Sequence, residues 1–199
     1  MTTKPKTTKT KTTKSKTHTT AKASKPKATS KPSANGLTHW GKTWRAFLCI
    51  TMPLLGGFLI SLSSRDTMLK FGMLKQPPLA PPAWLFPVAW TILYLLMGIA
   101  SYLICLKFLT GTKSESHKAR IALIIYAVQL FLNFIWTPIF FNAGLYWVAL
   151  AVLIAMWILE IILISMSFKL SKAAFWCLLP YLLWTTFAAY LNISIAILN

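Results

Sequence analysis

The chain has 199 residues, of which 56% are hydrophobic and 12% are charged, and its mean hydropathy is +0.59. Soluble globular domains carry about a quarter charged residues, so this composition excludes a single soluble domain. Lysine and arginine outnumber acidic residues by 21 to 3, and the chain is therefore expected to be a membrane protein with a basic extramembrane part.

The N-terminal segment differs from the rest of the chain. Residues 1–36 contain ten lysines and no acidic residue, among mostly Thr, Ser, Ala and Pro. This segment has too little apolar surface to offset chain entropy, so we predict a disordered basic tail over residues 1–44. A solvated, self-repelling tail is favoured over a tether to anionic lipid, in which each lysine would contribute up to about 1 kcal/mol. No aromatic residue is interleaved to stack on bases, so nucleic acid is not an expected partner.

Five apolar runs follow, and each is about long enough to cross the hydrocarbon core of a bilayer as a helix. We therefore predict an all-α integral membrane fold, in which residues 45–199 form one five-transmembrane-helix bundle. The predicted spans are residues 46–62, 83–106, 121–141, 145–168 and 173–198.

Basic residues flank these spans unevenly. With five spans, the tail shares one side of the membrane with the loops around residues 107–120 and 169–172, which hold most of the other flanking lysines and arginines. The positive-inside rule then places the N-terminus in the cytoplasm and the C-terminus outside. This orientation applies to a bacterial plasma membrane, whereas a eukaryotic chain would be expected in the mitochondrial outer membrane.

The connection over residues 63–82 is the longest and the only one rich in proline, and long loops in compact bundles usually serve a function. Its prolines prevent a helix before Ala83 and stiffen the path of the chain. We predict that this loop is a lid over the mouth of the bundle, with Trp84 and Phe86 turned into it. Trp84 could instead belong to the aromatic belt at the lipid interface.

Aromatic and polar residues share faces of the second and third predicted spans. Trp90 and Tyr94 lie one turn apart, and Gln129, Asn133 and Trp136 are spaced four and three residues apart, which places each set on one helix face. Amides in the middle of a membrane need partners, so the face with Gln129 and Asn133 should look into the bundle. Taken alone, these two amides predict interhelical hydrogen bonds and nothing more.

The fifth predicted span carries a similar stripe. Tyr181, Thr185, Ala188 and Asn192 line one face, and Trp184 lies on its edge. Three helices that each present aromatic rings with a few amides or hydroxyls predict a cavity for a large, flat, mostly apolar ligand.

Glu160 is the only acidic residue inside a predicted span. Intramembrane carboxyl groups can carry protons, but its span holds none of the aromatic motifs. A structural role, protonated or paired inside the bundle, is therefore favoured. The cysteines at positions 49, 105 and 177 lie in apolar runs without paired spacing, so neither a disulfide framework nor a zinc site is expected.

Three ordered motifs resemble the translocator protein family, TspO/MBR, whose members are also called tryptophan-rich sensory proteins or peripheral-type benzodiazepine receptors. They are PPxWxFPxxWTxLYxxMG from Pro81, YxxQLxLNxxW from Tyr126 and PYxxWxxFAxxLN from Pro180. The resemblance covers about residues 45–199. It implies a five-helix bundle, usually dimeric, that binds tetrapyrroles such as protoporphyrin IX and drugs of the isoquinoline or benzodiazepine type.

The resemblance also implies that most of these aromatic and amide residues line a pocket closed by the 63–82 loop. Together with the stripe residues Tyr94 and Gln129, they make up the candidate site. The candidate ligand-binding residues are Trp84, Trp90, Tyr94, Gln129, Asn133, Trp136, Tyr181, Trp184 and Ala188. No catalytic residue, metal site or required cofactor is expected, and the expected ligand is protoporphyrin IX or a haem-like tetrapyrrole.

The expected function is that of a membrane receptor or carrier, with the lipid bilayer, a tetrapyrrole or other apolar small molecule, and a second copy of the chain as partners. Two alternatives stay open. One is light-dependent porphyrin degradation at the pocket tryptophans, as is reported for some members of the family. It is not favoured, because the sequence shows no nucleophile–base set, no carboxylate pair and no histidine placed as an axial iron ligand. The other is a generic small transporter, although five spans do not divide into inverted repeats.

Overall fold

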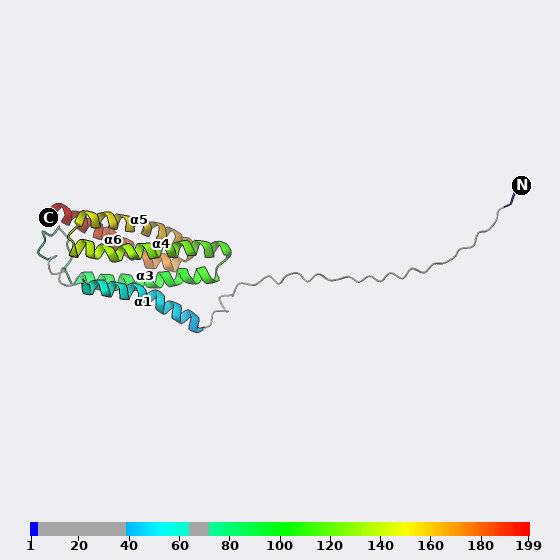
Figure 1. The fold of residues 1–199 in the computed structure, drawn as a ribbon, viewed down its shortest axis with the longest axis horizontal. Helices are drawn as coiled ribbons and strands as arrows, with labels where there is room; N and C mark the ends of the chain where they lie inside the picture. The colour runs from blue at the N-terminus through cyan, green and yellow to red at the C-terminus, as the bar shows by residue number, and fades with distance from the viewer. Residues whose placement is uncertain (4–38, 64–71) are drawn as a thin grey trace. The chain divides into compact units, whose positions relative to one another are not determined.

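The computed structural model describes residues 1–3, 39–63 and 72–199. The predicted tail up to residue 38 and the first part of the predicted lid, residues 64–71, lie outside the described residues. The described chain from His39 onward forms a bundle of long helices (Figure 1). Its elements are α1 (His39–Ser63), α3 (Leu85–Thr110), α4 (Lys113–Thr137), the π-helical turn η2 (Pro138–Asn142), α5 (Tyr146–Leu170) and α6 (Lys172–Leu198).

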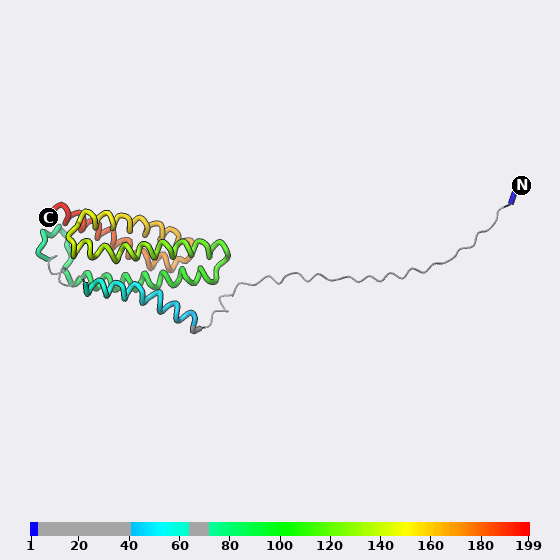
Figure 2. Tube along the Cα trace, in the orientation of Figure 1, coloured from blue at the N-terminus to red at the C-terminus, as the bar shows by residue number. Residues whose placement is uncertain are grey.

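All five long helices have the length and composition to cross a membrane, with mean hydropathies of 1.5 to 2.7 over their most apolar windows. The prediction of a five-helix integral membrane bundle is confirmed, and the chain is a multi-pass membrane protein. Along the tube in Figure 2, consecutive helices run in opposite directions. The 72–84 segment and the C-terminus therefore lie at one end of the bundle, called here the loop end.

Two helices begin earlier than predicted. The first, α1, starts at His39 instead of residue 46, so residues 39–44 belong to a helix and not to the tail; α4 starts at Lys113 instead of residue 121. The prediction followed the apolar runs, which end where the hydrocarbon ends. Backbone hydrogen bonds nevertheless continue into polar residues until a capping group stops them.

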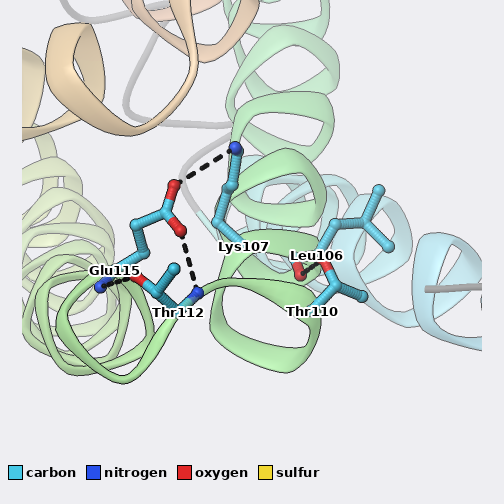
Figure 3. Close-up of polar contacts among 5 residues, drawn as sticks. All are labelled: Leu106, Lys107, Thr110, Thr112 and Glu115. Atoms are coloured by element: carbon cyan, nitrogen blue, oxygen red, sulfur yellow. Dashed lines mark hydrogen bonds and ion pairs between the residues drawn. The ribbon is translucent and has the colours of Figure 1, made fainter. Parts of the chain in front are cut away.

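The start of α4 is fixed by a capping box in the short turn after α3 (Figure 3). The Thr112 hydroxyl accepts from the backbone N–H of Glu115 at 3.3 Å, and the Thr112 N–H donates to Glu115 Oε2 at 2.8 Å. The other carboxylate oxygen of Glu115 lies 3.5 Å from Lys107 Nζ at the end of α3. This reciprocal cap satisfies donors that the first turn leaves open and holds α3 and α4 antiparallel.

The helices are packed unequally. In α1 only 6% of the residues in the apolar window are buried, against 33–39% in the other four helices. The main partner of α1 is α3, whereas α3, α4, α5 and α6 pack on one another. The bundle therefore consists of a four-helix core with α1 attached to its side.

Glycines allow α1 to approach α3 and α4 closely, as small residues do in membrane bundles. A Cβ atom on Gly98 would lie 2.7 Å from Ile50 Cα and 3.0 Å from the Cys49 carbonyl oxygen. On α1, Gly56 faces the ring of Phe134 and Gly57 faces the ring of Tyr94. The seam between α1 and the core thus depends on the absence of side chains at these three positions.

Candidate ligand-binding site

A hydrogen-bonded network of tyrosines and amides occupies the interior of the bundle. The Tyr94 hydroxyl of α3 donates to Asn133 Oδ1 of α4 at 2.6 Å, and Asn133 Nδ2 donates to the Tyr181 hydroxyl of α6 at 3.0 Å. Gln129 Nε2 also donates to the Tyr181 hydroxyl, which itself donates to Met156 Sδ of α5 at 3.3 Å. All five side chains are buried. The amides of α4 therefore face the interior and meet partners there, as buried polar groups generally do.

Trp90 is the centre of an aromatic cluster where α3 meets α6. Its ring stacks on Tyr94 with 5.4 Å between centroids, and it meets Tyr181 and Trp184 edge to face at 6.2 and 6.5 Å. Phe86 also meets Trp184 edge to face, with 6.1 Å between ring centroids. Such offset and edge-to-face pairs stabilise the packing beyond the area they bury, so they strengthen the contact between α3 and α6.

A cavity of about 370 Å³ lies beside this cluster, between α1, α3 and the junction of α4 with η2. Its volume falls in the range of about 300–1,000 Å³ that is usual for small-molecule sites. Its wall is mostly apolar and aromatic, with four hydroxyl-bearing residues among its members. The residues that line it are Leu54, Gly57, Phe58, Ile60, Ser61, Pro87, Trp90, Thr91, Tyr94, Thr137 and Phe141.

Six of the nine predicted site residues come together in the bundle, although only two of them reach the cavity. Trp90 and Tyr94 form part of its wall. Gln129, Asn133 and Tyr181 lie behind Tyr94 in the hydrogen-bonded network. Trp184 packs behind Trp90. These four residues can support the wall but do not line the cavity.

The other three predicted residues lie elsewhere. Trp136 stacks on Phe140, and its indole N–H donates to Asn192 Oδ1 at 3.2 Å. Ala188 and Trp136 belong to one cluster of buried apolar residues, and Tyr94 and Tyr181 belong to another. Trp84 is the N-cap residue of α3 and is 65% exposed, so the structure does not turn it into the bundle. Its exposure suits the interfacial belt that the sequence left open, and Phe86 is the ring that points inward.

The contribution of α1 to the cavity was not predicted from the sequence. Five residues between Leu54 and Ser61 form one wall of the cavity, yet α1 carries none of the three motifs. The available signal was the Gly56–Gly57 pair. This pair marks the place where the α1 backbone meets the rings of α3 and α4.

The described part of the predicted lid is fastened to the end of α6. The Tyr190 hydroxyl donates to the Pro78 carbonyl oxygen at 2.7 Å, and the Lys75 N–H donates to Asn199 Oδ1 at 3.0 Å. Between these anchors, the Ala80 N–H donates to the Pro77 carbonyl oxygen at 3.2 Å, and Leu79 has a φ of +68°. This is the type II turn that a proline at its second position favours. None of residues 72–84 lines the cavity.

We expect Tyr190→Phe to loosen this loop without unfolding the bundle. The change removes one exposed hydrogen bond, which contributes about 0.5–1.5 kcal/mol, from the contact between the loop and α6. Limited trypsin digestion, followed by mass spectrometry at the Lys75 site, should show faster cleavage in the variant. Cleavage at the wild-type rate, or at the same rate as in a Tyr102→Phe control, would contradict this anchoring role.

Among the described residues, no group of three or more His, Cys, Asp or Glu side chains is placed to hold a metal ion. The chemistry that the cavity offers is therefore apolar and aromatic contact, with hydroxyls from Ser61, Thr91 and Thr137 for orientation. This combination suits a flat, largely apolar molecule with a few polar substituents.

Comparison with known proteins gives a consistent result. The sequence profile of the TspO/MBR family matches residues 49–198. The chain is 34% identical to the tryptophan-rich protein TspO of Chlorobaculum tepidum over 153 residues, which is 76% of this chain and 94% of that protein. It is 38% identical to the translocator protein homolog of Schizosaccharomyces pombe over 78% of this chain and 91% of the relative. It is 36% identical to the translocator protein of Bos taurus over 71% of this chain and 82% of that protein.

Proposed function

The chain belongs to the TspO/MBR family, and we propose that it is a membrane receptor or carrier for a tetrapyrrole such as protoporphyrin IX. The observation that carries this proposal is the cavity walled by the stacked pair Trp90 and Tyr94. A flat macrocycle would pack against this pair on one side and against Phe58 of α1 on the other. Each aromatic contact would add about 0.5–1.5 kcal/mol beyond the area it buries.

Tyr94 connects the cavity to the hydrogen-bonded network in the core. Its ring faces the cavity, while its hydroxyl donates to Asn133, which in turn donates to Tyr181. A ligand that shifts the Tyr94 ring must therefore disturb bonds between three core helices. This arrangement supports a receptor role, because occupancy of the cavity would change contacts that hold the bundle together.

The 63–82 loop and a second copy of the chain complete the proposal. The loop would cover the loop end of the bundle, where its described part is bonded to α6. A homodimer is implied by the family resemblance, and light scattering from the detergent-solubilised protein measures it directly. The lipid bilayer surrounds the helices, because large apolar side chains such as Ile154, Ile158 and Ile162 are exposed along one face of α5.

The test is a titration with protoporphyrin IX, followed by quenching of tryptophan fluorescence. Phe58→Ala should raise the dissociation constant about threefold to tenfold, because it removes one aromatic wall. Phe47→Ala is a matched control: Phe47 lies on the same helix with a similar exposure, 55% against 59%, and does not line the cavity. Absence of quenching in the wild type, or an equal loss in both variants, would rule out this site.

A further inference from the structure

Glu160 is a buried acidic residue for which the proposed ligand site has no use. It lies in the middle of α5, and its side chain has an exposed fraction of 0%. One carboxyl oxygen, Oε2, accepts from the Thr185 hydroxyl of α6 at 2.8 Å. The other, Oε1, is buried and has no hydrogen-bond partner among the described residues.

No cation compensates this carboxyl group within the described part of the chain. The ion pair found there, Lys107 with Glu115, lies at the turn between α3 and α4. Among the described residues, the ionisable groups in the neighbourhood of Glu160 are tyrosines: Tyr181 of α6 lies near it, and Tyr126 of α4 and Tyr94 of α3 lie near Tyr181. The turn η2 carries no ionisable side chain. An unpaired carboxylate in such an interior is very costly, so the carboxyl group is stable there only with a bound proton.

The carboxyl group is also connected to the wall of the cavity. Thr185 bonds to Glu160 and, one helical turn away, contacts the backbone carbonyl of Tyr181 at 3.1 Å. The Tyr181 hydroxyl donates to a thioether sulfur, which is a weak acceptor. It receives bonds from Gln129 and Asn133, and Asn133 accepts from Tyr94 at the cavity. Glu160 is thus bonded to Thr185, one turn of α6 from Tyr181, and the Tyr181 side chain belongs to the network that reaches the cavity wall.

We propose that Glu160 is a proton-binding site whose occupancy is coupled, through Thr185, Tyr181 and Asn133, to ligand in the cavity. Glu160 takes up a proton from water to become neutral, and returns it when the carboxylate gains a stronger donor. A ligand that pulls the Tyr94 hydroxyl away from Asn133 loosens the bonds on Tyr181, and the Tyr181 hydroxyl can then leave the sulfur for the carboxylate. Ligand binding therefore releases the proton and, by linkage, affinity rises with pH.

The first experiment tests the proton itself by infrared spectroscopy of the purified full chain at neutral pH. The chain has three acidic side chains, Asp66, Glu115 and Glu160, so assignment is direct. The wild type should show the carbonyl stretch of a protonated carboxyl group; the band should be absent in Glu160→Gln and present in the Glu115→Gln control. If the wild type lacks the band, or if it persists in Glu160→Gln, the proton site is overturned.

A second variant keeps this test informative if Glu160→Gln does not fold. Thr185→Val retains the carboxyl group and removes the hydroxyl that bonds to it. The carbonyl band should then move to higher frequency, as a carbonyl group does when it loses a hydrogen-bond donor. An unshifted band would overturn the assignment to Glu160.

The coupling rests on the proposed function, and a separate measurement tests it. Protoporphyrin IX is added to weakly buffered protein with a pH-indicator dye. The wild type should release protons in step with binding, and Glu160→Gln should bind without this release. Equal release from both proteins, or none from the wild type, overturns the coupling. If the ligand does not bind at all, the proposed function fails, while the infrared result still decides whether Glu160 holds a proton.

Discussion

Tyr181→Phe is expected to lower the free energy of unfolding of the bundle by about 2–4 kcal/mol, although it removes a single oxygen atom. That oxygen accepts from Gln129 and Asn133 and donates to Met156. Without it, two buried amide N–H groups lose their acceptor, and each such loss costs about 1–3 kcal/mol in proteins and toward the lower end of that range in membranes. Thermal unfolding in detergent, followed by circular dichroism, should show a Tm lower by roughly 5–12 °C.

The matched control for this change is Tyr102→Phe. Tyr102 lies on α3 and is only partly buried, and the described chain shows no hydrogen bond to its hydroxyl. Its Tm should stay within about 2 °C of the wild type, since surface changes of this kind cost less than about 0.5 kcal/mol. Equal Tm values for the two variants would mean that the Tyr181 hydroxyl is not the hub of the network.

Gly98→Val is expected to displace α1, which forms one wall of the cavity, from α3. Because a Cβ atom at this position would lie 2.7 Å from Ile50 Cα, the backbone of α1 has to move. Overpacking of this kind costs about 1–3 kcal/mol, and α1, which is the least buried helix, should yield before the four-helix core does. Hydrogen exchange should therefore accelerate in α1 while α5 and α6 keep their protection, and the affinity for protoporphyrin IX should fall at least tenfold.

Ala155→Val serves as the comparison for Gly98→Val. Ala155 is exposed on α5, so the added carbon atoms enter lipid and meet no backbone. This variant should keep both the exchange pattern and the ligand affinity of the wild type. Retention of wild-type affinity by Gly98→Val itself would show that α1 is not part of the binding wall.

The fold could be predicted from the sequence because each span needs a long apolar run, which composition alone reveals. The inward face of α4 could also be predicted, since Gln129 and Asn133 lie one turn apart and cannot face lipid unpartnered. Residue spacing along a helix does not reveal which neighbouring helix each part of a face contacts. Tyr181 and Ala188 share a stripe on α6 but lie about 10 Å apart along the axis, and they belong to different core clusters.

The errors at the cavity have a related cause. Trp84 and Phe86 are two residues apart, so a helix turns them to different sides, and only Phe86 is buried. The position of α1 depends on glycines, whose effect on packing appears only when the facing helix is known. Spacing along one helix therefore predicted the supporting network behind the cavity better than the cavity wall itself.

Because α1 is the least buried helix and lines the cavity, the outer wall of the cavity borders the hydrocarbon phase of the membrane. An apolar ligand dissolved among the acyl chains can reach this wall laterally, without crossing bulk water. The effective concentration of the ligand beside the cavity is then set by how strongly it partitions into the membrane. Affinities measured in micelles will accordingly depend on the amount of detergent, and comparison between laboratories requires the mole fraction of ligand per lipid instead of its molarity.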